Sequence, residues 1–160
     1  GYALTYGQEA EIIISSFDSD FFQLITDNVS VLRYRGDSTV ICTPDYIKSK
    51  YNIEPRQYAD FKSMVGDASD NIKGADKVGP KTAAYLLNRF GTLDNILANA
   101  ESIEKPSIRD SIIRNADRLR TNYKIIRLNN ATQLPFALNN LAYSFAEVVT
   151  TDVLKGIGIY

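Results

Sequence analysis

The pattern of apolar and polar positions changes in character near residue 43. Three short stretches before that point are rich in β-branched and aliphatic residues and are typical of strands. They read AEIIISS, SVLRY and STVICT, at residues 10–16, 30–34 and 38–43. The first is a continuous apolar run of the kind found in a strand covered on both faces. Residues 1–43 are therefore expected to form the C-terminal part of an α/β domain.

Beyond residue 43 the apolar spacing becomes helical. Thr43 followed by Pro44 is the signature of a helix N-cap with proline at the first helical position. A second helix is expected to end at Gly91, a residue suited to a left-handed cap. The inward-facing residues of this helix and of a further one over residues 107–119 recur at helical spacing. They are Ala83, Leu86, Leu87 and Phe90, and then Ile108, Ile112, Ile113 and Leu119.

These patterns divide the chain into three parts. Residues 1–43 are the end of the α/β part, and residues 44–128 are a mainly helical region. Within the second part, residues 64–90 form a distinct segment in which two aspartates precede a turn bracketed by glycines and then an apolar helix. Residues 129–160 lack clear periodicity and are expected to be a tail that returns to the α/β part.

The composition narrows the function only slightly. The chain has 160 residues, enough for one domain with a genuine core, and a net charge of -1 from 18 basic and 19 acidic residues. Any nucleic-acid binding must therefore come from local charge patterning. The single cysteine, Cys42, lies in an apolar run and is expected to be a buried, reduced side chain. With no long apolar run or leader pattern, we expect a cytoplasmic protein without membrane contact.

A first pair of carboxylates follows the first expected strand. Asp18 and Asp20 are two residues apart, so both side chains can lie on one side of an extended chain end. Clustered carboxylates repel one another unless a hard cation such as Mg²⁺ lies between them. The alternative from the residues alone is that one aspartate simply caps the helix predicted for FFQLITD.

A second pair, Asp67 and Asp70, is three residues apart in VGDASDN, where a helix or tight turn would place both on one face. An EF-hand loop is excluded because Ile72 and Val78 stand where that loop needs glycine and glutamate. A different kind of metal site therefore has to be considered.

A glycine-rich turn follows at once. Gly74 and Gly79 bracket it, and a helix begins directly after Gly79, so backbone amides with Lys81 and Thr82 would face outward at the positive end of the helix dipole. Such an arrangement binds a phosphate without reading a base. The alternative is an ordinary glycine-rich helix start with an exposed lysine.

Together, SSFDSDFFQLI and GDASDNIKGADKVGPKTAAYLLNRFGTLDNIL resemble the 5′ nuclease or flap endonuclease family, in particular the 5′-3′ exonuclease domain of bacterial DNA polymerase I and its stand-alone bacterial and phage relatives. The two blocks occur in the family's order, with 49 residues from Asp18 to Asp67 (67 − 18), and the resemblance covers residues 2 to 128. It implies the edge of a PIN-like (resolvase-like) α/β sheet followed by a helix-hairpin-helix region.

The resemblance also implies roles for particular residues. The metal ligands would be Asp18, Asp20, Asp67 and Asp70. The residues that hold the DNA backbone would be Lys73, Gly74, Lys77, Gly79, Lys81 and Thr82, with Arg89 as a further basic contact. Two Mg²⁺ or Mn²⁺ ions would serve the complete enzyme, and the hairpin of this family commonly holds K⁺ as well.

Two features depart from the family pattern. Lys77 stands where the family usually has glycine before the second hairpin turn, so that residue either adopts a less favourable backbone conformation or the turn is reshaped. The acidic residues that make the family's first metal site are absent. We therefore expect the C-terminal part of a longer nuclease, with little or no activity alone and with the missing N-terminal half as its partner; the catalytic residues upstream are unknown.

The expected function is that of a structure-selective, divalent-metal-dependent 5′-3′ exonuclease or flap endonuclease. Its expected partner is duplex DNA with a 5′ flap or 5′ end, bound by a monomer in a bacterial or phage-infected cytoplasm. The alternative is a non-catalytic helix-hairpin-helix module that binds duplex DNA. A phosphatase with an aspartate nucleophile is disfavoured, because Phe21 and Phe22 follow where such enzymes place a small residue or threonine.

Overall fold

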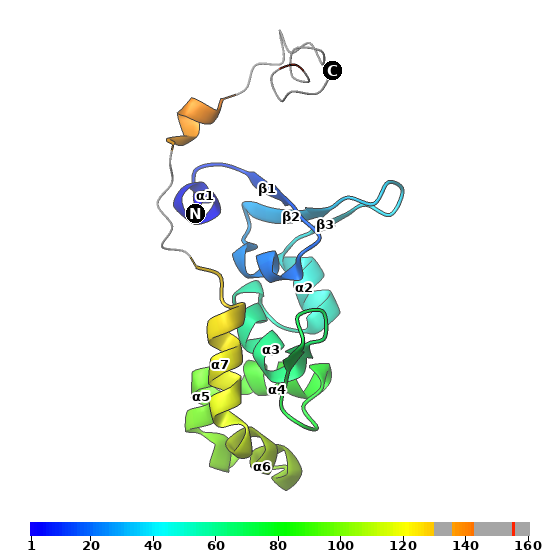
Figure 1. Cartoon of the computed structure of the whole chain (residues 1–160), viewed down its shortest axis with the longest axis vertical. Helices are drawn as coiled ribbons and strands as arrows, with labels where there is room; N and C mark the ends of the chain where they lie inside the picture. Colours follow the sequence, from blue (N-terminus) through cyan, green and yellow to red (C-terminus); the bar gives the residue numbers. More distant parts are fainter. Residues whose placement is uncertain (130–135, 143–154, 156–160) are drawn as a thin grey trace.

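The computed structural model describes residues 1–129, 136–142 and 155 of the chain. A small sheet lies beside the N-terminus, and a group of helices extends from it (Figure 1). This arrangement confirms the expected fold class, a piece of α/β sheet followed by a mainly helical region. Among the described residues, no helix is both long and apolar enough to cross a bilayer.

The N-terminal part begins with a short helix, α1, and contains a three-stranded sheet with a 3-10 helix after its first strand. The elements are α1 (Tyr2–Tyr6), β1 (Ile12–Ser15), η1 (Ser19–Leu24), β2 (Val29–Arg33) and β3 (Val40–Cys42). Strands β1 and β2 are parallel, β2 and β3 are antiparallel, and the order is β1-β2-β3. Both parallel strands therefore end at the same edge of the sheet.

One face of this sheet is buried, and the other is not. Val29, Val31 and Cys42 are at most 1% exposed, whereas Ile13 and Ile41 are each 54% exposed. The prediction that β1 is covered on both faces is therefore wrong for the described residues. The core lies on one side only, so successive side chains of β1 alternate between half-buried and exposed.

The helical part contains six α-helices among the described residues, with a short β-hairpin after the second. The elements are α2 (Pro44–Tyr51), η2 (Pro55–Gln57), α3 (Tyr58–Val65), β4 (Gly66–Asp67), β5 (Ile72–Lys73), α4 (Pro80–Phe90), α5 (Leu93–Ala98), η3 (Ala100–Ser102), α6 (Pro106–Arg114) and α7 (Ala116–Ile126). Helix α3 is central and packs against both α4 and α7.

Local signals fix several of these boundaries. The Thr43 hydroxyl accepts a hydrogen bond from the Tyr46 amide, and Pro44 is the first residue of α2, as predicted. Helix α4 ends at Gly91, whose φ of 87° lies in the region that glycine tolerates best. The buried carboxylate of Asp60 accepts from the Leu93 amide and so starts α5 from a neighbouring helix.

The helix predicted over residues 107–119 is instead two helices. Asn115 ends α6, and its side-chain amide donates to the carbonyl of Ser111, four residues earlier, a local bond that competes with helix continuation. Ile113 directly follows Ile112 and so lies about 100° around the helix from the buried face, and it is 43% exposed rather than inward-facing. Ile108, Ile112 and Leu119 are buried as expected.

One core joins the two parts of the chain. Phe22 of η1 lies edge-on to Tyr58 of α3, with ring centroids 5.2 Å apart, and Tyr51 packs in the same way on Tyr58 and Phe61. The largest fully buried side chains are Phe22, Val29, Val31, Ile47, Ile53, Met64, Leu86, Leu87, Leu93, Ile96, Ile112 and Leu119. Segment η1 is therefore seated directly on the helical part.

Most of the expected C-terminal tail, residues 129–160, lies outside the described residues. In the described section at 136–142, η4 (Leu138–Leu141) forms a single turn. The Tyr2 hydroxyl donates to the carbonyl of Phe136 at 2.8 Å, so this section contacts α1.

Candidate metal centre and nucleic-acid interface

The first carboxylate pair lies in the link between β1 and η1. Asp18 is the N-cap of η1, and its carboxylate accepts a hydrogen bond of 2.8 Å from the Asp20 amide. The capping interpretation of this motif is thus correct for Asp18. The cap also fixes the backbone that carries both aspartates at the carboxyl edge of the sheet.

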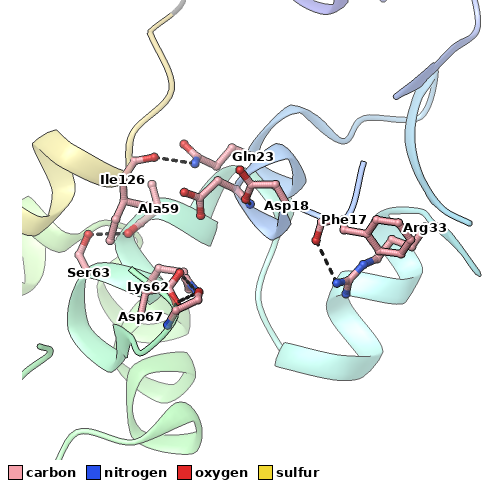
Figure 2. A network of polar contacts seen from close by, with 11 residues as sticks. Phe17, Asp18, Gln23, Arg33, Ala59, Lys62, Ser63, Asp67 and Ile126 are labelled. Carbon is pink, nitrogen blue, oxygen red and sulfur yellow. Dashed lines mark hydrogen bonds and ion pairs between the residues drawn. The ribbon is translucent and has the colours of Figure 1, made fainter. Parts of the chain in front are cut away.

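A long-range contact holds this segment in place. The Gln23 side chain donates to the carbonyl of Ile126 at 3.0 Å and accepts from the Leu128 amide at 3.3 Å. Figure 2 shows the Gln23 side chain facing the carbonyl of Ile126 at the end of α7. The segment carrying the first pair is therefore tied to the far end of the helical part.

The second pair lies in the tight hairpin β4–β5, which follows α3. Gly66 has φ 89°, and a Cβ on this residue would lie 2.5 Å from the carbonyl oxygen of Ile72, so glycine is required at this point. Asp67 is 7% exposed, and its carboxylate accepts from both the amide and the hydroxyl of Ser69. Asp70 lies in the exposed turn that follows.

Asp67 also forms an ion pair with Lys62 of α3, drawn as a dashed contact in Figure 2. The Lys62 side chain is only 13% exposed, so both charges are largely removed from water. Burial alone would raise the pKa of the Asp67 carboxyl. The bonds from Lys62 and Ser69 outweigh that effect and hold its pKa below the usual value.

The two pairs influence each other electrostatically. Burial, and then the negative charge of Asp18, raise the pKa of Asp20 to about 6. Asp67 and Asp70 make smaller contributions in the same direction, and the positive charge of Lys62 opposes them. The fold has therefore brought all four aspartates, from segments 49 residues apart (67 − 18), into one electrostatic neighbourhood around Asp20.

The fit of this cluster to a divalent ion can be tested on two observations. One carboxylate oxygen of Asp20 is buried without a hydrogen-bond partner, an orphaned acceptor of the kind that a cation would satisfy. However, no group of three or more acidic, histidine or cysteine side chains in the described part of the chain is arranged so that it could hold a metal ion. Lys62 explains part of this difference, because its ammonium group already neutralises Asp67. The assignment of Asp18, Asp20, Asp67 and Asp70 as metal ligands stays a prediction.

Lys62 is the residue that sequence reasoning missed. Its neighbours Ala59, Phe61, Ser63 and Met64 are all buried, so a lysine inside this stretch had to reach a buried partner or extend to the surface. A lysine within a buried helix, five residues before an aspartate, was the available signal (67 − 62).

The predicted phosphate-binding turn directly follows this hairpin. Lys77 has φ 64°, so it adopts the left-handed conformation that glycine would adopt more easily. Of the two possibilities left open by the sequence, the structure shows the strained lysine. Gly79 precedes α4 with open space around it and no side-chain cap, so the first amides of α4 face away from any side-chain acceptor.

Side chains of α6 and α7 hold the turn through hydrogen bonds to its backbone carbonyls. The Asn122 side chain donates to the carbonyls of Ser63 and Lys73, each at 3.0 Å, and the Ser111 hydroxyl donates to the carbonyl of Asp76. Gly74 is buried against the α3 backbone, where a Cβ would come 2.2 Å from the carbonyl oxygen of Met64. Gly74 therefore has a packing role in this structure.

The predicted basic residues differ in exposure and in whether they already form an ion pair. Lys77 and Lys81 are exposed, and Thr82 is half-buried beside Lys81. Lys73 lies 3.6 Å from Asp76, and Arg89 lies 2.8 Å from Glu104. Since exposed ion pairs exchange readily, Lys73 stays available to a phosphate, whereas Arg89 also bonds the Tyr85 hydroxyl and is the most engaged of the set.

Comparison with known proteins places these features in context. Residues 53–148 match the family model described as 5′-3′ exonuclease, C-terminal SAM fold. The chain is 35% identical over 127 residues to a 5′-3′ exonuclease of Buchnera aphidicola subsp. Acyrthosiphon pisum, covering 76% of this chain and 44% of that protein. It is also 35% identical over 129 residues to the thermostable DNA polymerase I of Thermus thermophilus, covering 81% of this chain and 15% of the polymerase.

A solved structure shares the fold. The T5 5′-exonuclease with bound divalent zinc ions matches with a TM-score of 0.67 and 21% identity, covering 78% of this chain and 46% of that one. The chain thus spans less than half the length of each of these relatives.

Proposed function

Because the chain belongs to the 5′-3′ exonuclease family, of which it spans the C-terminal region, we propose that it is part of a structure-selective, divalent-metal-dependent 5′-3′ exonuclease or flap endonuclease. The observation that carries this proposal is the buried carboxylate oxygen of Asp20 that has no hydrogen-bond partner, on a side chain whose pKa is also raised by Asp18, Asp67 and Asp70. A turn and a helix N-terminus suited to phosphate follow Asp70 in the chain. Duplex DNA with a 5′ end or flap is the proposed substrate, bound by a monomer.

In this proposal the chain would hold divalent ions, Mg²⁺ or Mn²⁺, through Asp18, Asp20, Asp67 and Asp70. Bound there, such ions would neutralise the scissile phosphate and lower the pKa of the attacking water. The orphaned oxygen of Asp20 is the first acceptor they would satisfy. Lys62 holds Asp67 ionised, and a bound ion would compete with Lys62 for this carboxylate. The solved zinc-bound relative supports the use of divalent ions in this fold.

The β4–β5 hairpin, the turn after it and the start of α4 would bind the DNA backbone. Lys73, Lys77 and Lys81, with the free amides of α4, would hold a stretch of DNA backbone so that the scissile bond lies at the carboxylates. Gly79 leaves space for a close approach of the phosphate. The left-handed Lys77 keeps the turn in a glycine-like shape, so we also propose that its carbonyls can hold a K⁺ ion.

The family's other carboxylates would come from the upstream half of the nuclease, on the same chain or a separate one. We accordingly propose the division given above, with residues 1–43 completing an α/β nuclease domain and residues 44–128 binding DNA. The 160-residue chain alone is then expected to bind DNA without cutting it.

The test is release of a 5′ label from a flapped duplex, with Mg²⁺ or Mn²⁺, by the chain alone and with the upstream half added. Cleavage should need both parts, and Asp67→Asn or Asp70→Asn should reduce it far more than they reduce binding, because the ions act mainly on the transition state. Robust cutting by the chain alone would overturn the assignment of the active site.

Duplex binding is measured separately. Lys81→Ala should weaken binding to every sequence equally and lower its dependence on salt, since each phosphate contact adds about one unit to the salt slope. The matched control is Lys124→Ala, an exposed lysine on α7. Equal losses in both variants would mean that the hairpin is not the binding surface.

A second candidate, the non-catalytic duplex-binding module, is favoured by the Lys62–Asp67 ion pair, because a buried ammonium can replace a metal as the partner of Asp67. Melting temperature with and without Mg²⁺ separates the two. A metal-dependent rise that Asp20→Asn removes and Glu101→Gln retains supports the nuclease, and no rise in the unmodified chain supports the binding module.

A further inference from the structure

An aromatic and basic surface lies beside the acid cluster and has no role in the function proposed above. The Arg35 guanidinium lies over the ring of Phe17, 5.3 Å from its centroid, and Arg33 donates to the Phe17 carbonyl at 3.0 Å. We refer to Phe17, Arg33 and Arg35 as the aromatic shelf. Phe17 is 52% exposed, so its ring does not belong to the core.

The position of the aromatic shelf follows from the topology of the sheet. Phe17 directly follows β1, and Arg33 and Arg35 lie at the end of β2 and just beyond it. Because β1 and β2 are parallel, all three residues gather at the same carboxyl edge as Asp18. Figure 2 shows Arg33 reaching the Phe17 carbonyl next to Asp18.

The shelf is held in place by contacts that leave its ring and one guanidinium available. Arg33 also lies 5.9 Å from the ring centroid of buried Phe22, so its backbone bond to Phe17 is supported from the core side. Arg35 is exposed, and a cation over an exposed ring is only weakly bound to it. Ring and guanidinium can therefore open to admit a flat group between or beside them.

The chemistry that fits this surface is an unpaired nucleotide. Its base has the flat π-face that stacks on an aromatic side chain or a guanidinium plane, and its phosphate is the natural partner of arginine. A paired base within a duplex would not expose such a face. The shelf therefore fits a single-stranded segment, whereas the hairpin of the helical part suits a duplex backbone.

Resting on the proposed nuclease function, we propose that the aromatic shelf binds an unpaired nucleotide of the substrate, with its base against Phe17 and its phosphate on Arg35. The shelf thereby selects substrates in which single-stranded DNA leaves a duplex beside the carboxylates. Arg33 is a positioning residue, since it holds the Phe17 backbone.

The test compares binding of two fluorescein-labelled probes to the 160-residue chain in EDTA, a blunt duplex and the same duplex with a single-stranded 5′ overhang. Fluorescence anisotropy yields a Kd for each. We expect the overhang to bind about 5- to 150-fold more tightly than the blunt duplex, the range expected for one stacked base. Phe17→Ala and Arg35→Ala should each remove most of this preference and leave blunt-duplex binding unchanged.

Two further variants keep the test decisive. Phe17→Trp retains a stacking surface and should restore the preference. Tyr34→Ala is the matched control, because it removes another exposed aromatic side chain, 65% exposed, from the connection between β2 and β3. Circular dichroism melting of each variant checks that the fold is retained.

The outcomes separate this inference from the function on which it rests. Equal affinities of the unmodified chain for both probes, or equal losses in Tyr34→Ala and Phe17→Ala, would overturn the role of the shelf, while duplex binding that depends on Lys81 would still support the nuclease. Absence of any DNA binding would overturn both.

Discussion

The Asp18–Asp20 segment and the hairpin region at residues 66–82 meet at the same cluster, but different contacts hold them. The hairpin region is fixed by close backbone packing at Gly66 and Gly74 and by long-range bonds from α6 and α7. The aspartate segment relies on its own cap and on Gln23, and it leaves a buried oxygen of Asp20 without a partner.

The difference suggests a division of labour within the cluster. On the proposed function, the turn benefits from a backbone already set in its binding shape, because less ordering entropy is lost on binding. Carboxylates that await a cation repel one another in its absence, so their segment is stable only to the extent that local caps and tertiary bonds oppose that repulsion. The following variants test this contrast, beginning with the largest expected effect.

Gly74→Ala should have the largest effect. Its Cβ would lie 2.2 Å from the Met64 carbonyl oxygen, so the backbone of the turn or of α3 must move, and we expect a loss of about 3 kcal/mol or more in the free energy of unfolding. The matched control is Gly79→Ala, whose Cβ would meet nothing within 4 Å and should change stability by less than about 1 kcal/mol. Urea denaturation measures both, and equal losses would contradict the close packing of Gly74.

Asn122→Ala should be next. Without its side-chain amide, the carbonyls of Ser63 and Lys73 lose their hydrogen-bond donor in a buried site. The expected cost is about 2 kcal/mol in the free energy of unfolding. Hydrogen exchange should speed up first at the Ala75 amide, which donates to Met64 beneath the turn. Asn88→Ala, which removes an exposed side-chain bond to Asn52, is the control and should cost much less.

Asp20→Asn should act in the opposite direction and stabilise the metal-free chain. The pKa of Asp20 is about 6 in the folded state, above its ordinary value of 3.8, so the folded state binds more protons between these pH values. Its contribution to stability is therefore fully present below about pH 4 and is lost as the pH rises to about 6. At pH 7.5 the variant should gain about 1 kcal/mol, after allowance for solvent around a half-buried group.

Melting curves from pH 4 to pH 8 measure this effect. The unmodified chain should lose stability relative to Asp20→Asn as the pH rises from 4 to 6, and the difference should stay constant above that window. A difference that is independent of pH would show that Asp20 is not strained by its neighbours.

Lys77→Gly should have the smallest effect on stability. Relief of the left-handed strain is offset by the greater freedom of glycine in the unfolded chain, so the gain should be about 0.5 kcal/mol. DNA affinity should fall through loss of one charge. Lys77→Asn also tolerates the left-handed conformation, so it separates the loss of charge from the change in backbone freedom. Equal DNA affinity of the unmodified chain, Lys77→Asn and Lys77→Gly would exclude a phosphate contact at this position.

The features that could be predicted from the sequence are those with local causes. The Thr43 cap, the end of α4 at Gly91 and all three strands of the sheet follow from a few neighbouring residues. The end of α6 at Asn115 could not be predicted from apolar spacing, because Ile112 and Leu119 on either side of it are seven residues apart, the spacing of two helical turns.

The candidate site shows the same limit. The two aspartate pairs are visible as motifs, but whether they meet depends on how η1 is seated against α3, which no local pattern encodes. Lys62 was overlooked because its importance comes from burial beside Asp67, a property of the folded chain. The sequence shows that Lys77 replaces a glycine at this turn. It does not show whether the lysine adopts a left-handed conformation or the turn changes shape.

The bonds of Gln23 to residues 126 and 128 have a consequence for the order of folding. These pairs are 103 and 105 residues apart, so the long-range bonds that hold the first aspartate segment depend on residues made near the end of the described helical part. During synthesis from the N-terminus, the strands and α2 emerge well before α7. A nascent chain that still lacks α7 therefore holds its first aspartate segment by the Asp18 cap and the packing of Phe22 alone, without the Gln23 bonds that complete it.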